Sequence, residues 1–551
     1  MKQVLKFFQG LLLTTFISQP LFAQGAGEAA SDGSRLVLVA IISLVLALVF
    51  AVIVVTADNL IRIKGRQIGF DEEKNGSLNL FPSLTDLFRG SRPGYAKQHP
   101  FFDLRSGHDI LLEGQVTDSA VHDAQVNTFS VQPTDFHGIA PIPKMLVETG
   151  QEVKAGDSLF FDKSNPDIMF AAPVSGEVVA INRGEKRAIT EVVILADKDG
   201  ISYREFPSID LSNTTREALQ AHLMGSGVWP MIRQRPYLVL ADPNRVPRDI
   251  FISTFDTAPL APDAAVLVKG REDAFQKGLD ALALLTDGHV YLGLDGRGEE
   301  PPSRAYTEAQ GVRKVWFKGA HPAGNVGVQI HHVKPINGGE TVWTLDVQAV
   351  ISIGQLLLGN RFDATRIVAL TGDECTENNY VRTAIGANIG DLVQDRLNEG
   401  PVRIISGDVL TGTKKELTGF LGFFDDQITA IEEGDYYENF GWLVPTKARP
   451  TASSSYFSSI FGDFRYHADT NTHGEKRAFV VTGKYEDVLP MDVYPQQLLK
   501  AILVRDLEQM EGLGIYELVE EDVALCEFVC TSKQPIQEIL REGLEEMRAQ
   551  G

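Results

Sequence analysis

Cysteine is the residue type in this chain that could hold a redox cluster, and the chain has few of them. There are three in 551 residues: Cys526 and Cys530 lie one helical turn apart, and Cys375 is remote. A [4Fe–4S] cluster needs four thiolates or equivalent ligands. Because three cysteines do not supply that set, we interpret them as small apolar side chains of a buried core, with no disulfide framework.

Histidine is the second candidate ligand type, at His321 and at the pair His331 and His332 in the string HPAGNVGVQIHH. This string predicts a glycine turn feeding a strand, on which adjacent side chains point to opposite faces. We therefore expect no metal site there. The sequence also lacks the H-E-x-x-H, G-x-S-x-G and P-loop lysine motifs, so an autonomous hydrolase or kinase has no support.

Lys163 is the candidate for a covalently carried group. The surrounding region, residues 102–201, has short alternating runs between Gly and Asp turns, which is typical of β structure. The string V-x-x-G-x-x-V-x-x-G-x-x-L-F followed by A-P-V-S-G-x-V resembles the biotinyl/lipoyl barrel-sandwich hybrid. Carrier domains of that fold present a modified lysine on a tight hairpin. Lys163 falls near that place but lacks flanking methionines, so we favour an unmodified domain used as an interface and keep a carrier as an alternative.

Three further regions follow the barrel-sandwich domain. Residues 202–360 alternate helix and strand patterns, which predicts a Rossmann-like α/β domain. Residues 361–448 are rich in short strand patterns typical of a β-grasp (SLBB-like) domain, and residues 449–551 are mainly helical. The predicted fold class is therefore α+β and multidomain.

The amino terminus predicts a cleavable signal peptide over residues 1–23. Lys2 and Lys6 precede an apolar stretch that Pro20 interrupts, and Ala23 is a small residue at the expected cleavage position. A first transmembrane helix is the alternative interpretation. The apolar core of this stretch is short, which argues against a transmembrane helix.

A second apolar run predicts a transmembrane anchor within residues 24–60. Residues 36–57 contain 22 residues without a charge, which as a helix would span about 33 Å, against a hydrocarbon core of about 30 Å. Residues 61–101 form a connector in which Leu84, Leu87 and Phe88 predict a short amphipathic helix.

The basic residues around the predicted span indicate its orientation. Arg62, Lys64 and Arg66 follow the span closely, whereas residues 24–35 hold a single basic residue. The positive-inside rule places the following side in the cytoplasm. We expect a single-pass protein of the bacterial inner membrane, with its amino terminus outside and most of the chain cytoplasmic. The net charge of −22 argues against nucleic-acid binding.

Several long strings carry a family resemblance over roughly residues 102–551. They are PVSGEVVAINRGEKR, HPAGNVGVQIHHVKP, RTAIGANIGDLV, RIISGDVLTGTK, FGWLVP and GKYEDVLPMDVYPQQLLKAI with EEDVALCEFVC. In this order they resemble the A-subunit family of the Na+-translocating NADH:quinone oxidoreductase (Na+-NQR). The first hundred residues depart from the family pattern and are interpreted as a built-in anchor.

The resemblance implies a peripheral subunit of a respiratory sodium-transporting translocase (EC 7.2.1.1) that oxidises NADH and reduces ubiquinone or another quinone. It implies that FAD, FMN, riboflavin and iron–sulfur centres belong to other subunits and that this chain alone is not catalytic. Expected partners are the other subunits, above all the quinone-side membrane protein of the complex (its B-subunit), together with the membrane and quinone.

A flavin site in this chain is the next question, because the middle region also looks related to flavin-binding subunits of complex I and Rnf-type complexes. Those proteins approach a phosphate with a glycine-rich loop. The comparable stretch here, residues 225–230, has bulky Val228 and Trp229 where small residues are needed, and residues 253–259 differ as well. We predict a flavin-free domain. An Rnf-like electron-transfer subunit is the second alternative.

Quinone contact is the remaining chemistry. A quinone head needs donors for two carbonyl oxygens and flat apolar walls. Two stretches in the first half of the soluble body combine donors with rings, and we name their residues as quinone-proximal candidates: Asp135, Phe136, His137, Arg233, Arg235 and Tyr237. The alternative is that these residues pack between domains or against a membrane subunit.

Overall fold

The computed structural model describes residues 40–46, 48–50, 52, 53, 56, 57, 60, 92–438, 449, 452 and 465–550. The chain divides into two units, residues 1–91 and residues 92–551. The predicted signal peptide and the predicted amphipathic helix at residues 84–88 lie outside the described residues.

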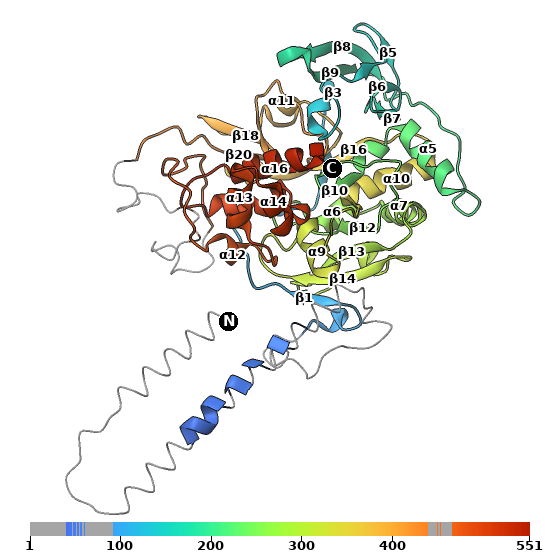
Figure 1. Cartoon of the computed structure of the whole chain (residues 1–551). Helices are drawn as coiled ribbons and strands as arrows, with labels where there is room; N and C mark the ends of the chain where they lie inside the picture. The colour runs from blue at the N-terminus through green and yellow to red at the C-terminus, as the bar shows by residue number, and fades with distance from the viewer. Residues whose placement is uncertain are drawn as a thin grey trace, which may run out of the picture. The chain divides into compact units, whose positions relative to one another are not determined.

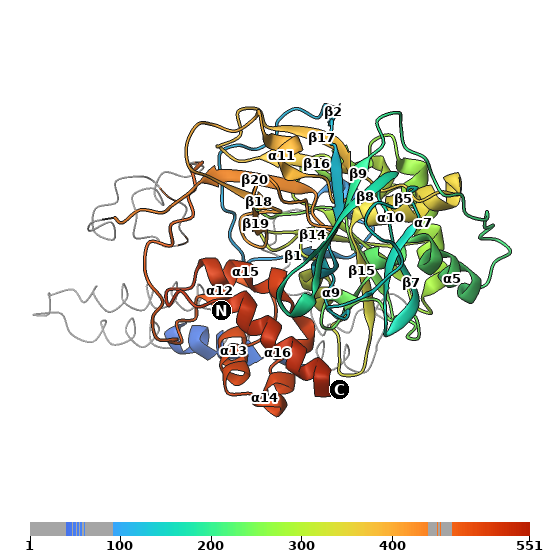
Figure 2. The ribbon, with the colours of Figure 1, turned by 90° about the horizontal axis from the view of Figure 1, so that it is seen from above.

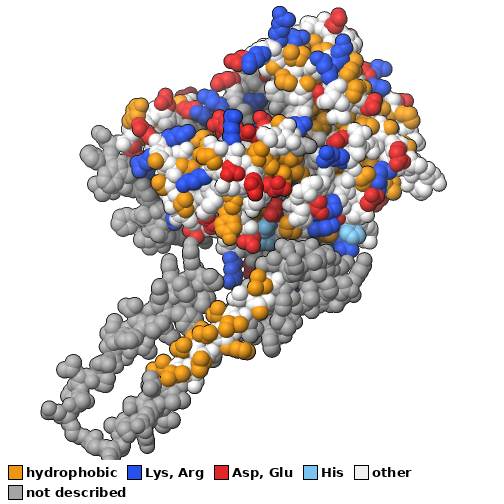
Figure 3. All heavy atoms as spheres, viewed as in Figure 1, with side chains coloured by type: hydrophobic (Ala, Val, Ile, Leu, Met, Phe, Trp, Pro, Cys, Tyr) orange, Lys and Arg blue, Asp and Glu red, His pale blue; other side chains and the backbone are white. Residues whose placement is uncertain are grey.

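In the first unit, every described residue between 40 and 60 is helical. Apolar side chains there are exposed, for example Leu46 at 64% and Phe50 at 67%, and Figure 3 shows them as an apolar strip. The predicted span falls only partly on described residues. Among those, no helix is long and apolar enough to cross a membrane.

A seven-stranded sheet forms the centre of the second unit. Four neighbouring pairs are parallel (β1–β14, β14–β13, β13–β12 and β12–β15), and β10 and β11 add an antiparallel edge. In sheet order the strands are β1 (Phe101–Asp103), β14 (Arg313–Lys318), β13 (Val290–Asp295), β12 (Ile250–Ser253), β15 (Val342–Leu345), β10 (Arg233–Arg235) and β11 (Val239–Leu240).

The two faces of this sheet bury two different cores, because successive side chains of a strand point to opposite faces. Ile250 and Ile252 join the core under helices α7 (Glu272–Leu285) and α10 (Val347–Gly359), whereas Phe251 joins the core shared with α9 (Val326–Val333) and the carboxyl-terminal helices. Asp346 caps the amino-terminal end of α10, where its carboxylate accepts a hydrogen bond from Ala349 N.

Helix α9 corrects one sequence expectation. HPAGNVGVQIHH was expected to be a turn and a strand, yet Val326–Val333 is a helix. Its β-branched residues favour a strand locally, but the segment connects β14 to β15, which lie in one sheet beyond two other strands. Such a crossover is normally made by a helix packed on the sheet, so the tertiary position overrides the local propensity.

The barrel-sandwich domain is built of two small sheets. One has the order β3 (Thr128–Val131), β9 (Ile189–Ala196), β8 (Gly176–Arg183) and β5 (Glu152–Val153). The other has the order β4 (Lys144–Met145), β6 (Ser158–Asp162) and β7 (Asn165–Ala171). Helix α5 (Arg216–Ser226) follows and packs on β7.

A six-stranded mixed sheet forms the β-grasp-like region. Its order is β19 (Thr413–Lys415), β18 (Val402–Ser406), β20 (Gln427–Glu432), β16 (Thr365–Thr371), β17 (Asn379–Ala384) and β2 (Val121–Asp123). Strands β1 and β2 precede the barrel-sandwich strands in sequence but pair with the α/β sheet and with this sheet. The chain therefore contributes a strand to the α/β sheet, to the β-grasp-like sheet and to the barrel-sandwich domain in turn, with β1, β2 and β3.

The carboxyl-terminal region is a group of short helices, which Figures 1 and 2 show gathered together. They are α12 (Tyr485–Val488), α13 (Pro495–Leu503), α14 (Leu507–Gly512), α15 (Glu520–Phe528) and α16 (Ile536–Gln550). Their apolar faces share one core with α9 and with one face of the seven-stranded sheet, so this region is an integral layer of the second unit.

Candidate functional site

Four of the six candidate residues line one cavity of about 320 Å³: Asp135, Phe136, His137 and Arg233. Asp135 ends the 3₁₀ turn Pro133–Asp135 of the barrel-sandwich domain and Phe136 and His137 follow it, whereas strand β10 presents Arg233. The β-grasp-like region and the carboxyl-terminal helices complete the wall with Thr411, Phe424, Asp425, Glu520, Glu521 and Gln537. The cavity is thus the meeting point of four parts of the second unit.

Aromatic rings form the apolar side of the cavity. Phe136 is buried, and its ring packs edge-on against Phe170, Phe423 and Phe424 at centroid distances of 4.7, 4.6 and 5.7 Å. The Arg233 guanidinium lies 4.8 Å from the centroid of Phe424. This contact holds a cation against a flat ring at the edge of the cavity.

Two carboxyl groups in the cavity wall have raised pKa values. Burial raises the pKa of Asp135 to about 7, against a hydrogen bond from Phe423 N to its Oδ2 at 2.8 Å, and the nearby Asp425 raises it further. Burial also raises the pKa of Asp425, whose Oδ2 accepts a hydrogen bond from Ser406 Oγ at 2.5 Å. Both groups can carry a proton closer to neutral pH than a solvated aspartate can.

His137 faces the acidic end of α15. Its Nε2 lies 4.0 Å from Glu520 Oε1, and its side chain is 43% exposed. Partial burial and the positive charge of Arg541 lower the pKa of His137, while Glu520 acts in the opposite direction. The imidazole can therefore donate or accept a hydrogen bond at the mouth of the cavity.

Arg235 and Tyr237 lie outside the cavity. Arg235 is buried and forms ion pairs with Asp522 (2.8 Å) and with Glu521. Tyr237 stacks edge-on against Tyr516 at 6.2 Å. Both residues join β10 and the turn after it to the carboxyl-terminal helices, so the structure gives them packing roles.

Several cavity residues were not among the sequence candidates, namely Phe424, Asp425, Glu520 and Gln537. Phe424 and Asp425 belong to the run FFDD, in which two rings are followed by two carboxylates. That combination of flat walls and proton carriers was a usable signal. No sequence signal pointed to Glu520 or Gln537, because these residues reach the cavity only through the packing of the carboxyl-terminal helices.

The degenerate glycine loop has a structural role at the end of α5. Gly227 has φ +86° and caps the helix, and a Cβ there would overlap the Cβ of Ala171. Trp229 is completely buried, donates from Nε1 to Ala241 O at 2.9 Å, and packs edge-on against Trp343. Phosphates bind at the amino-terminal ends of helices. This loop follows the carboxyl-terminal end of α5 and is occupied by an indole ring.

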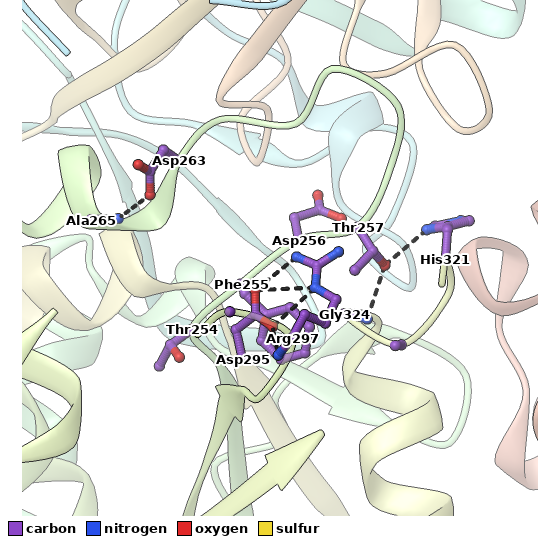
Figure 4. A network of polar contacts seen from close by, with 12 residues as sticks. Thr254, Phe255, Asp256, Thr257, Asp263, Ala265, Asp295, Arg297, His321 and Gly324 are labelled. Atoms are coloured by element: carbon purple, nitrogen blue, oxygen red, sulfur yellow. Dashed lines mark hydrogen bonds and ion pairs between the residues drawn. The ribbon is translucent and has the colours of Figure 1, made fainter. Parts of the chain in front are cut away.

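The loop after β12 forms a second polar network at the carboxyl edge of the sheet (Figure 4). Thr257 Oγ1 accepts from Gly324 N at 3.0 Å and lies 3.1 Å from His321 Nδ1. Arg297 pairs with Asp295 at 2.8 Å and lies 5.5 Å from the ring of Phe255. Asp256 is exposed at its surface but loses part of its hydration to the surrounding protein atoms. This desolvation, together with nearby carboxylates, raises the pKa of Asp256 to about 6.

The candidate metal ligands are dispersed. His331 Nδ1 lies 2.7 Å from Glu517 Oε2, and His332 Nε2 lies 2.7 Å from Pro490 O. Cys375, Cys526 and Cys530 are buried, and burial raises the pKa of the Cys375 thiol to about 12. Within the described part of the chain, no group of three or more His, Cys, Asp or Glu side chains is arranged to hold a metal ion.

Lys163 occupies the two-residue turn between β6 and β7 and is exposed. The hairpin is stabilised by Asp162, which accepts a hydrogen bond from Ala140 N at 3.0 Å.

Comparisons with known proteins identify the family. Residues 102–197 match the NqrA N-terminal barrel-sandwich hybrid domain, residues 214–362 the NqrA second alpha/beta domain, and residues 367–416 the NQRA C-terminal domain. The A-subunit of the Na(+)-translocating NADH-quinone reductase from Alcanivorax borkumensis is 38% identical over 451 residues, which is 81% of this chain and 99% of the relative. The chain belongs to this NqrA family.

Two other NqrA proteins match this chain with similar identity and coverage. The corresponding reductase A-subunit from Saccharophagus degradans is 37% identical, and that from Yersinia pseudotuberculosis is 36% identical, each over 81% of this chain and 99% of the relative. Among solved structures, an NAD+-reducing [NiFe]-hydrogenase chain matches at 12% identity with a TM-score of 0.33, over 64% of this chain and 67% of that chain. That likeness is too slight to bear on function.

Family membership confirms the predicted resemblance and the predicted set of domains: a barrel-sandwich hybrid, an α/β domain and an SLBB-like domain. The NqrA relatives correspond to about 450 residues of this chain, and the matched domains begin at residue 102.

Proposed function

We propose that this chain is part of a sodium-pumping respiratory NADH:quinone oxidoreductase and that it supports quinone reduction and the stability of the complex. The observation that carries the proposal is identity of 36–38% with proteins named for that enzyme over 99% of their length. Catalysis belongs to the complex. Within it, this chain supplies binding and packing surfaces.

The cavity around Asp135 and Arg233 is the proposed quinone-contact site. Its volume of about 320 Å³ lies at the lower end of the usual range for small-molecule sites. Arg233 and His137 can donate hydrogen bonds to quinone oxygens, and the rings of Phe136 and Phe424 supply flat apolar walls. Because Arg233 already lies over Phe424, a quinone ring beside it would meet a donor and a π-face together.

Protons for the reduction have candidate carriers in the same wall. Reducing a quinone to a quinol takes two electrons and two protons, and in this proposal the electrons come from the other subunits. Asp135, with a pKa of about 7, can give up a proton near neutral pH and recover it from solvent. Asp425 lies in the same wall and also has a raised pKa.

The proposal includes attachment to the bacterial inner membrane. Residues 36–57 are long and apolar enough to span a bilayer as a continuous helix. The basic residues that follow favour a cytoplasmic body with the amino terminus outside. The quinone-side membrane protein of the complex, its B-subunit, is the proposed neighbour, since quinone reaches the enzyme from the bilayer.

Affinity purification of the full chain from its native membranes in mild detergent tests the proposal. The preparation is assayed for Na+-stimulated NADH:quinone reduction, and the co-purifying chains are identified. Partners with bound flavin and sodium-stimulated turnover are expected. A chain that purifies alone and without activity would contradict the assignment and would direct attention to the carrier alternative at Lys163.

A further inference from the structure

Helix α16 borders the cavity with a polar face, while its opposite face belongs to the core. Gln537 on this helix lines the cavity. Arg541 and Arg548 follow on the same side, because helix residues four and seven apart share a face. Leu540 and Leu544, on the other side, are completely buried in the core of the carboxyl-terminal helices. The apolar face thus anchors the helix, and the polar face is presented to the cavity.

Arg541 binds the acidic residue that faces His137. Its Nε donates to Glu520 Oε1, and its Nη2 donates to Glu520 Oε2 at 2.6 Å. Its Nη1 donates to the carbonyl oxygen of Tyr237 at 2.9 Å. The side chains of Arg541 and Glu520 are only 15% and 20% exposed. A planar guanidinium that meets both oxygens of a carboxylate holds it in one orientation, and shielding from water strengthens this contact.

The engagement of Glu520 determines which contacts remain for the His137 imidazole. His137 Nε2 lies 4.0 Å from Glu520 Oε1, which is beyond hydrogen-bond distance. Both oxygens of Glu520 already accept hydrogen bonds from Arg541. Burial lowers the pKa of His137, and the positive charge of Arg541 lowers it further, against the effect of Glu520. The imidazole is therefore neither hydrogen-bonded to Glu520 nor encouraged to take up a proton.

Two other charged groups face His137 from the surrounding elements. Glu545 on α16 raises the pKa of His137, and Arg233 on β10 lowers it, each with a smaller effect than Arg541 or Glu520. These two act in opposite directions. Among the charged neighbours, the pair of Arg541 and Glu520 is thus the one whose disruption should change His137 most.

Backbone contacts hold the loop that carries His137. Gly138 O accepts a hydrogen bond from Arg548 Nη2 at 3.2 Å, and a Cβ at Gly138 would overlap that guanidinium. On the other side, His137 O accepts from Leu240 N of β11 at 3.4 Å. The loop is therefore bound between α16 and β11, so the place of the imidazole at the mouth of the cavity depends on α16.

We infer that Arg541 is a positioning residue of the cavity: by engaging both oxygens of Glu520, it leaves the His137 imidazole unpaired and available to a quinone oxygen. Arg541 is not among the residues that line the cavity, so it acts through Glu520. A neutral imidazole can donate a hydrogen bond to a carbonyl oxygen without bringing a charge into the site. The role of quinone rests on the function proposed above, whereas the effect of Arg541 on His137 does not.

The protonation of His137 tests the inference without quinone. Diethyl pyrocarbonate reacts with neutral imidazoles. Its rate of reaction at His137 in the purified full chain, followed by peptide mass from about pH 5 to about pH 9, gives the pH of half-maximal reaction. Arg541→Gln removes a nearby cation and releases Glu520. Both changes favour the imidazolium, so this pH should rise by roughly one unit.

Two further variants separate the charge of Arg541 from its geometry and from general effects on α16. Arg541→Lys keeps the charge but not the two-point contact, so it should shift the reaction of His137 less than Arg541→Gln does. Arg505→Gln is the control. It removes a cation that lies 3.6 Å from Glu546 on the same helix, and it should leave the reaction of His137 unchanged.

Steady-state kinetics of the purified complex connect this change to quinone. In Arg541→Gln at about pH 6.5, His137 should be charged and paired with Glu520, so the KM for quinone should rise roughly fivefold. At about pH 9 the imidazole is neutral again, and the KM should return to within about twofold of the unaltered value. The KM for NADH should stay the same at both pH values. A merely structural defect would raise the KM for quinone equally at both.

The outcomes distinguish this inference from the function on which it rests. An unchanged reaction of His137 in Arg541→Gln, or a KM for quinone raised equally at both pH values, would overturn the inference. A shifted reaction of His137 with unaltered quinone kinetics at both pH values would support the positioning of His137 by Arg541 and would contradict the quinone-contact site.

Discussion

Arg235 on β10 and Asp522 on α15 form an ion pair 2.8 Å long whose side chains are 1% and 0% exposed. A Cβ at Gly327 would overlap both charged groups, so the glycine of α9 makes room for the pair. The pair thus connects the seven-stranded sheet to the carboxyl-terminal helices at a point that water does not reach.

Removing one partner of this pair should destabilise the second unit strongly. Arg235→Met leaves Asp522 buried without its partner, at an expected cost of about 3–5 kcal/mol. Asp522→Leu in the same chain should recover part of the loss, which thermal unfolding will measure. Arg304→Ala is the control, because that pair with Glu308 is at the surface and contributes at most about 1 kcal/mol. An Arg235→Met change no more harmful than the control would contradict the prediction.

Quinone kinetics should depend on the donors of the cavity. His137→Ala and Arg233→Ala should each raise the KM for quinone roughly tenfold, as expected for loss of a hydrogen bond involving a charged or polar donor. The KM for NADH should not change. The measurement is steady-state turnover of the purified complex, with His122→Ala, an exposed histidine on β2, as the control. Unchanged quinone kinetics in both variants would remove the cavity from the quinone pathway.

Stability should depend on pH through Asp135. Its folded-state pKa of about 7 lies above the ordinary value of 3.8, so between those two values the folded state holds a proton that the unfolded state releases. Stability should therefore fall as the pH rises from about 4 to about 7, and the loss should be complete above pH 7.

Asp135→Asn should reduce this fall, because the amide cannot ionise. Comparing melting temperatures at pH 5 and pH 8 should show the difference shrinking by roughly 2 °C or more. Asp426, whose pKa burial raises to about 8, contributes a fall of the same sign that remains in the variant. Asp167→Asn, at an exposed carboxylate on β7, should leave the slope as it is. An unaltered slope in Asp135→Asn would mean that Asp135 is ionised in the folded protein at all these pH values.

Two glycines at the carboxyl-terminal end of α5 should respond in opposite ways. Gly227→Ala places a Cβ against Ala171 in a left-handed backbone and should destabilise the protein by about 1 kcal/mol or more. Gly225 lies in α5 with no atom within 4 Å of its Cβ position, so Gly225→Ala should be neutral or stabilising by up to about 1 kcal/mol. Thermal unfolding of both variants checks the prediction. A harmless Gly227→Ala would show that α5 can move away from β7.

The mass of the intact chain should show no group attached to Lys163. Its hairpin lacks the flanking residues of a carrier, and the family match is to NqrA proteins. Mass spectrometry of the protein purified from its native membranes provides the measurement. A fixed mass increase located to Lys163 would support the carrier alternative.

Sequence patterns were sufficient for the elements whose signal is local. The alternating helix and strand patterns of residues 202–360 predicted an α/β region, and the structure has strands such as β13 and β15 and helices such as α7 and α10 there. The order of motifs identified the NqrA family, and four of the strings fall within the residue ranges that the NqrA family models match. In these cases the backbone preference and the burial of each side chain agree.

Long-range packing decided the rest. Helix α9 forms from residues that favour strands because a crossover between parallel strands needs a helix. Arg233 and Arg235 lie two residues apart on one strand, yet one faces the cavity and the other is neutralised by α15, whose Asp522 is 287 residues away in the sequence. Composition and periodicity specify which segments become helices and strands. They do not specify which distant charge a side chain meets or how much water it loses, because both depend on how the separate regions pack together.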